Sequence, residues 1–201
     1  NKTKLNCKVC QLVKLYKNGE PFKMSKRAGE FIAAQDLLNE VEKDQIRFMM
    51  LNRSNDVELD FDFDKVKEKT KDNPVFYVQY CYARICSLSR TCNINLEDPI
   101  EINNNFILNT YEIDLLKKIF DWPKIIETAS KKLEPHRIPF YLYELATIFH
   151  SYWSKGNEDE QFKFIKDDRM TNKNTLAVIK LLAIVLKIGM NILGVSLPKK
   201  M

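Results

Sequence analysis

Residues 72–90 read DNPVFYVQYCYARICSLSR and place a long helix near the middle of this chain. Pro74 suits the first turn of a helix, where a backbone N–H would have no intrahelical partner. Apolar side chains then recur every three or four residues up to Arg90, which is the spacing of one buried helix face. They are Val75, Val78, Tyr82, Ile85 and Leu88. The pattern predicts a helix that contributes one face to a hydrophobic core.

Beyond this stretch, toward the C-terminus, helical spacing returns four times. Residues 93–105 are polar and predict a loop. The helices that follow are predicted at Thr110–Phe120, Lys124–Leu133, Pro139–Ser154 and Asn172–Leu193, and prolines separate several of them. Short connections between amphipathic helices favour an antiparallel bundle. The fold class is therefore mainly α.

Toward the N-terminus the pattern changes to short strands and short helices. Residues 5–17 alternate loosely and predict a pair of short strands turned at Asn18-Gly19. Two short helices are expected at residues 34–41 and 44–52. Residues 57–64 alternate strictly between apolar and acidic side chains, as in a half-buried strand or an extended linker. We place a domain boundary after residue 65, giving regions 1–65 and 66–201.

The composition is that of an ordinary soluble domain. The 201 residues are 45% hydrophobic and 29% charged, with five glycines and a net charge of +5. A modest positive charge fits a protein that meets a polyanion, although many proteins without such a partner are equally basic. The most apolar stretch, residues 176–193, is interrupted by Lys180 and Lys187, so we expect a buried helix and no membrane association. No secretory signal segment is recognisable, and we expect a cytoplasmic protein.

Cys7 and Cys10 form a C-x-x-C pair, which raises the question of a metal or redox site. A structural zinc site needs four ligands, and no second pair follows at a suitable spacing. We expect no metal site and interpret the five cysteines as free, buried thiols of a reducing compartment.

The strongest chemical signal is the loop Lys23-Met24-Ser25-Lys26-Arg27. Its flexible cations can converge on a polyphosphate and neutralise the charge that builds up on a leaving pyrophosphate. The serine hydroxyl and the backbone N–H groups can add further hydrogen-bond donors. The alternative is a solvated basic loop without a ligand.

This loop resembles the KMSKS signature of class I aminoacyl-tRNA synthetases. The resemblance implies ATP binding by Lys23, Met24, Ser25, Lys26 and Arg27, with ATP and Mg²⁺ as substrate and no tightly bound cofactor. It also implies that Lys26 is the main catalytic residue and that Lys23 assists it. Arg27 departs from the more common serine, but arginine at this place is frequent in the arginine enzymes that keep the motif.

A second resemblance covers nearly the whole chain, residues 9–201. The stretch from Asp72 to Tyr80, followed by Ala83-Arg84, is similar to the start of the helical, DALR-type anticodon-binding domain of arginyl-tRNA synthetases. Further similar pieces occur in the same order. They are Asp44-x-x-Arg47-Phe48, residues 59–62, His136-Arg137, residues 142–146, Phe149-His150, and the end from Leu193 to Met201. The resemblance implies a helix bundle behind the end of a class I catalytic domain.

The same resemblance implies tRNA contacts. Tyr77, Gln79, Tyr80 and Arg84 can stack on unpaired bases and hydrogen-bond to their edges. The alternative is that these tyrosines lie in the core. His150 and the terminal Met201 stand where the family has residues near the anticodon, so they complete the expected tRNA-binding set.

The chain contains no His-x-Gly-His element and no strands and helices for an amino-acid pocket. We therefore expect the C-terminal portion of an arginine–tRNA ligase, inactive alone, whose partners in the intact enzyme are tRNA-Arg, ATP and arginine. We expect a monomer. The alternatives are a non-catalytic tRNA-binding module and another class I synthetase with a related helical domain.

Overall fold

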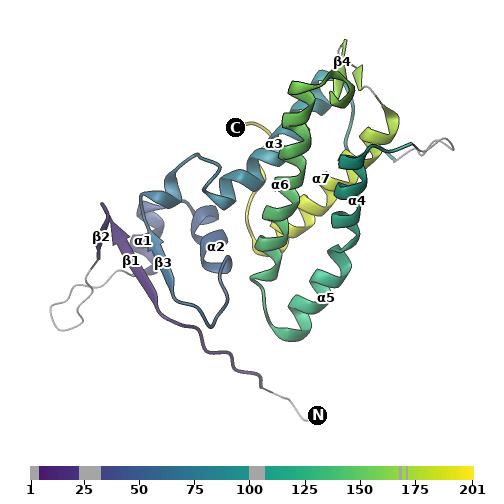
Figure 1. The fold of residues 1–201 in the computed structure, drawn as a ribbon. Helices are drawn as coiled ribbons and strands as arrows, with labels where there is room; N and C mark the ends of the chain where they lie inside the picture. Colours follow the sequence, from purple (N-terminus) through teal and green to yellow (C-terminus); the bar gives the residue numbers. More distant parts are fainter. Residues whose placement is uncertain (1–4, 23–32, 100–106, 168, 171) are drawn as a thin grey trace, which may run out of the picture.

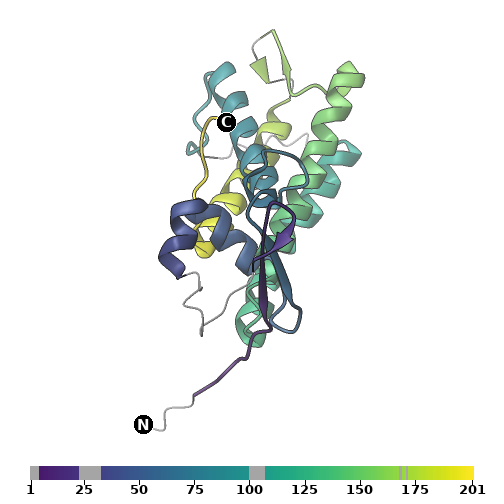
Figure 2. The same cartoon turned by 90° about the vertical axis from the view of Figure 1, so that its left-hand side faces the viewer.

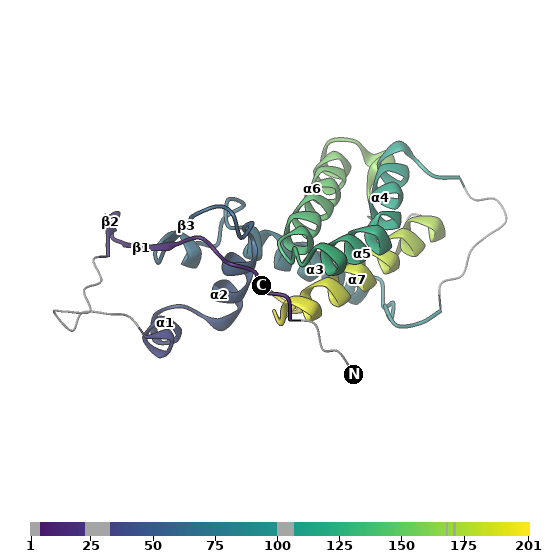
Figure 3. The same cartoon turned by 90° about the horizontal axis from the view of Figure 1, so that it is seen from below.

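The computed structural model describes residues 5–22, 33–99, 107–167, 169–170 and 172–201. In Figure 1 a group of helices occupies one side of the molecule, and strands with two short helices occupy the other. Seen from below, in Figure 3, these two parts lie side by side, with helix α2 (Lys43–Leu51) between them. The mainly helical fold that the sequence predicts is confirmed.

The smaller part is built on a sheet of three strands. Strand β1 (Val13–Lys17) pairs in antiparallel fashion with β2 (Glu20–Pro21) and in parallel with β3 (Leu59–Asp62). The turn between β1 and β2 contains Asn18 and Gly19, both with positive φ, as a tight hairpin turn requires. Helices α1 (Ala34–Glu40) and α2 lie in the crossover between β1 and β3. Strand β3 and helices α1 and α2 lie within the ranges that the sequence predicts, give or take one residue.

The larger part is a bundle of five helices. They are α3 (Pro74–Thr91), α4 (Thr110–Phe120), α5 (Trp122–Lys132), α6 (Arg137–Glu158) and α7 (Lys173–Leu193). Helix α6 contacts each of the other four, so it is the central element of the bundle. Short elements connect the helices to their surroundings. They are the 3₁₀ turns Lys65–Lys67 and Glu160–Phe162 and the hairpin of β4 (Ile165–Lys166) and β5 (Arg169–Met170).

Two hydrophobic cores correspond to the two parts. The small core gathers Leu15, Val41, Leu59, Phe61, Phe63 and Val66. The large core fills the bundle, and Phe48 of α2 belongs to it. Helix α7 is long and apolar enough to span a membrane by length and composition alone, but 61% of its most apolar window is buried in the molecule. It is a core helix, as the interrupting lysines predict.

Two expectations are wrong. Residues 5–12 form no strand, so only the second half of the predicted pair exists before the turn. Cys7 and Cys10 lie on this segment and are exposed, whereas Cys81 and Cys86 of α3 are buried. The interpretation of all five cysteines as buried thiols therefore fails for the C-x-x-C pair. Single backbone hydrogen bonds tie Gln11 to Asn55 and Leu12 to Leu59, but Leu5 and Val9 remain exposed, so this segment has no buried face to support a regular strand.

Candidate nucleic-acid interface

The crossing of α3 and α6 brings four of the six residues expected to bind tRNA into one cluster. Tyr77, Tyr80 and Arg84 are spaced three, four and seven residues apart, so they lie along one side of α3. His150 of α6 meets them, with its ring centroid 4.4 Å from that of Tyr77 and 5.7 Å from that of Tyr80. The three residues from α3 are half-buried and keep part of their surface open to solvent.

Arg84 holds this cluster together. Its Nη2 donates to the hydroxyl of Tyr80 at 3.1 Å, and its Nη1 lies 3.2 Å from His150 Nδ1. The guanidinium also stacks over the rings of Tyr80 and Trp153, at 4.4 and 4.9 Å from their centroids. A cation held in this way is fixed in orientation, and Arg84 keeps part of its surface open to solvent.

His150 is only 6% exposed, and burial lowers the pKa of its ring to about 4. The ring is therefore neutral at pH 7. Because the guanidinium of Arg84 can only donate, Nδ1 is the acceptor, and Nε2 donates to the carbonyl of Tyr77 at 3.2 Å. The expectation that His150 contacts RNA directly does not fit this burial. Its ring instead packs against Tyr77 and Tyr80 and hydrogen-bonds to Arg84, on the buried side of these residues.

Three aromatic residues that the sequence reasoning did not single out extend the cluster. Tyr143 lies 5.2 Å from Tyr77 between ring centroids, and Phe76 stacks on Tyr80 at 5.8 Å. Trp153 completes the stack on Arg84. Position 143 precedes His150 by seven residues and position 153 follows it by three, so helical spacing from His150 was the available signal. We call Phe76, Tyr77, Tyr80, Arg84, Tyr143 and Trp153 the aromatic face.

Gln79 and Met201 stand apart from the aromatic face. The side-chain amide of Gln79 donates to the carbonyl of Ser196 at 3.0 Å, so it is engaged with the C-terminal segment. Met201 is 51% exposed at the end of that segment. In Figure 2 the segment runs from the end of α7 along α3. The expected base contact of Gln79 thus competes with an interaction inside the molecule.

The loop Lys23-Met24-Ser25-Lys26-Arg27 lies outside the residues that the structure describes. Within the described parts of the chain, no three histidine, cysteine or acidic side chains converge as they would around a metal ion. The described geometry provides aromatic rings with an oriented cation between them, a surface on which unpaired bases can stack.

Comparisons with known proteins identify the family of the helical part. Residues 78–201 match the model of the DALR anticodon binding domain family. The chain is 57% identical over 202 residues to the arginine–tRNA ligase of Pelagibacter ubique and 42% identical over 205 residues to that of Roseobacter denitrificans. Each match includes the whole of this chain but only 35% of the relative, so the chain spans about a third of the length of these proteins.

Among solved structures, the chain is similar to arginyl-tRNA synthetases. A crystal structure assigned as an arginyl-tRNA synthetase from Campylobacter jejuni superimposes with a TM-score of 0.80 at 29% identity, over 96% of this chain and 40% of that one. The arginyl-tRNA synthetase of Thermus thermophilus superimposes with a TM-score of 0.66 at 19% identity, over 96% of this chain and 35% of that one. The second likeness concerns the fold alone.

Proposed function

Because the chain belongs to the family of the DALR anticodon binding domain, we propose that its helical part binds the anticodon region of a tRNA. The match of residues 78–201 to that family is the observation that carries the proposal. We further propose that the tRNA is tRNA-Arg, because the similar proteins of Pelagibacter ubique and Roseobacter denitrificans are arginine–tRNA ligases.

The aromatic face supports this proposal physically. Unpaired bases of an RNA loop bind proteins by stacking on aromatic rings and on guanidinium planes. Tyr80 and Arg84 offer both kinds of surface within one stack, where the guanidinium carbon is 4.4 Å from the ring centroid. Tyr77 and Tyr80 contact RNA in this scheme, and buried His150 holds them in place.

We propose that the intact protein joins arginine to tRNA-Arg with ATP and Mg²⁺ as substrate, in the cytoplasm and as a monomer. Lys26 and Lys23 would stabilise the pyrophosphate that leaves during arginine activation, and Met24, Ser25 and Arg27 would complete the ATP-binding loop. This chain alone supplies only the end of the catalytic domain. The division at residue 65 stays a prediction: Val66, just beyond it, belongs to the small core, and Phe48, before it, packs in the large core.

Two measurements test the proposal at its two levels. The 201-residue chain should bind tRNA-Arg, and its affinity should fall steeply with salt because phosphate contacts release counterions. The full-length protein should charge tRNA with arginine from a panel of amino acids, and Lys26→Ala should abolish the reaction while an exposed lysine outside the loop, changed in Lys124→Ala, leaves it intact. Charging with a different amino acid would refute the choice of arginine.

A further inference from the structure

The C-terminal segment, residues 194–201, leaves α7 through a sharp turn and then follows α3. Gly194 makes the turn with a φ of +67°, and the amide of Val195 closes it by donating to the carbonyl of Met190 at 3.0 Å. Val195 is buried, but Ser196, Lys199, Lys200 and Met201 are exposed. Of the outer residues, Leu197 packs partly buried against the large core, and hydrogen bonds to the backbone of Ser196 and Lys199 hold the segment on either side of it.

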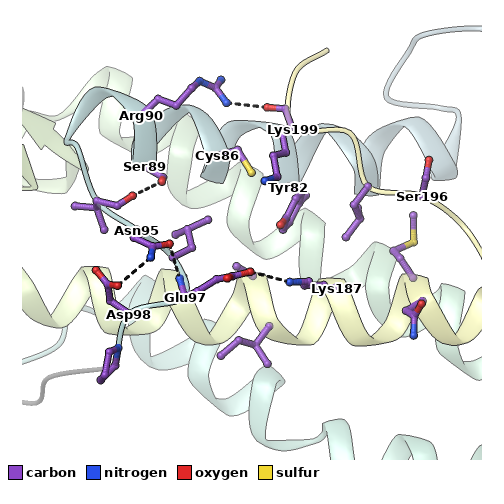
Figure 4. A pocket seen from close by; sticks show the side chains of 18 of the residues that line it. Tyr82, Cys86, Ser89, Arg90, Asn95, Glu97, Asp98, Lys187, Ser196 and Lys199 are labelled. Carbon is purple, nitrogen blue, oxygen red and sulfur yellow. Dashed lines mark hydrogen bonds and ion pairs between the residues drawn. The ribbon is translucent and has the colours of Figure 1, made fainter.

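Those hydrogen bonds come from two helices. Arg90 of α3 donates to the carbonyl of Lys199 at 2.9 Å, as Figure 4 shows. Gln79, three turns earlier on α3, donates to the carbonyl of Ser196. With these two anchors the segment forms one wall of a cleft of about 1260 Å³, whose other walls are α3, α7 and the loop around residues 93–99.

The third anchor comes from the smaller part of the molecule. Asp44 of α2 accepts the backbone N–H of Ser196 at 3.1 Å and also the hydroxyl of Ser196. The same carboxylate oxygen lies 3.4 Å from the amide nitrogen of Gln79. A carboxylate that accepts from three donors makes stronger hydrogen bonds than a neutral acceptor would.

A neighbouring contact fixes the point where the segment begins. Arg47 of α2 donates from Nε to the carbonyl of Leu193 at 2.7 Å. A Cβ on Gly194 would lie only 2.7 Å from this Nε, so the turn and the arginine fit closely. Arg47 and Asp44, one turn apart on α2, thus hydrogen-bond to the end of α7 and to the start of the segment.

We propose that Asp44 and Gln79 are positioning residues that set the path of residues 196–201 and so determine where Met201, the exposed last residue of that path and one of the residues expected to bind tRNA, meets bound RNA. This inference rests on the proposed function, and it assigns Gln79 a role inside the protein in place of a base contact. It also means that α2, which belongs to the smaller part of the molecule, contributes indirectly to RNA binding.

Hydrogen exchange tests the positioning without RNA. In Asp44→Ala the amide of Ser196 loses its acceptor and should exchange about tenfold faster or more, because the segment then opens locally. The amide of Val195 should keep its rate, since its acceptor is the carbonyl of Met190. Glu42→Ala is the matched control, an exposed acid at the same end of α2 whose side chain makes no cap bond. An unchanged rate at Ser196 would overturn the proposal.

RNA binding then tests whether the position matters, with an anticodon stem-loop of tRNA-Arg as the probe. Mutations that act through a positioning element change affinity by roughly 2- to 30-fold. We expect Asp44→Ala to weaken binding about fivefold. When Met201→Ala is already present, the loss should be less than about twofold, because the side chain that Asp44 positions is then missing. Equal losses in both backgrounds would refute positioning of Met201.

Gln79→Leu provides the second route in case Asp44→Ala does not fold, because it removes a bond to the carbonyl of Ser196 and leaves α2 intact. It should show the same dependence on Met201. A direct base contact of Gln79 would instead give an equal loss in both backgrounds and overturn its assignment. If the unmutated chain does not bind the stem-loop, the proposed function fails, and the exchange rate of Ser196 still decides the positioning.

Discussion

Acidification should destabilise this fold through His150, and the size of the effect follows from its surroundings. Burial lowers the pKa of the ring from its ordinary 6.5 to about 4. The unfolded chain therefore binds a proton at this site over the range between these two values, whereas the folded chain does not. Stability is lost as the pH falls below about 6.5, and the loss is complete below about 4.

The magnitude follows from the two values. One pKa unit corresponds to about 1.4 kcal/mol, so the full loss is about 3 kcal/mol, and the loss between pH 7 and pH 5 is about 2 kcal/mol. His136 also contributes to the pH dependence, because burial lowers its pKa below the ordinary value. The comparison is therefore with His150→Gln, which retains His136.

Urea unfolding followed by circular dichroism at pH 7 and pH 5 measures the difference. The free energy of unfolding should fall by about 2 kcal/mol more in the unmutated chain than in His150→Gln. The overall lower stability that the substitution causes cancels in this comparison. An equal pH dependence in both proteins would refute the buried, neutral histidine that supports the aromatic face.

Three further predictions concern packing and binding. Gly189→Ala should destabilise the bundle by about 1–3 kcal/mol, because the added Cβ would lie 2.7 Å from Leu142 Cδ2; thermal unfolding measures this, and an unchanged melting temperature would contradict the packing. Glu112→Ala should cost about 1–3 kcal/mol by urea unfolding, because the buried carboxylate accepts from Tyr152 and Thr175, and a smaller loss would mean that water replaces it. Tyr80→Ala should weaken binding of the tRNA-Arg stem-loop by about 1–3 kcal/mol, the value of one stacked base, whereas no change in affinity would remove this ring from the interface.

Helix α3 could be predicted from the sequence because its buried residues recur at helical spacing. The hairpin could be predicted because Asn18-Gly19 specifies its own turn. The parallel pairing of β1 with β3 could not, because it joins residues more than 40 positions apart and leaves no local pattern. The loop of residues 93–105 was expected from polarity, but its anchoring by buried Lys180 to the carbonyl of Asp98 depends on tertiary structure.

In the candidate site, too, contacts within one helix could be predicted from the sequence, whereas contacts between distant segments could not. Tyr77, Tyr80 and Arg84 share a helix face, so their proximity follows from spacing alone. The contact with His150 needs the crossing of α3 and α6, and the sequence does not indicate whether that ring faces the core or the solvent. Gln79 was assigned to RNA by its neighbours in sequence, whereas its amide meets Ser196, 117 positions away.

Anticodon recognition can be measured by comparing how the 201-residue chain binds tRNA-Arg and the same tRNA carrying a different anticodon. We expect tRNA-Arg to bind with an affinity that falls steeply between low and high salt, and the altered anticodon to weaken binding. Equal affinity for both RNAs, or no binding at low salt, would contradict this expectation.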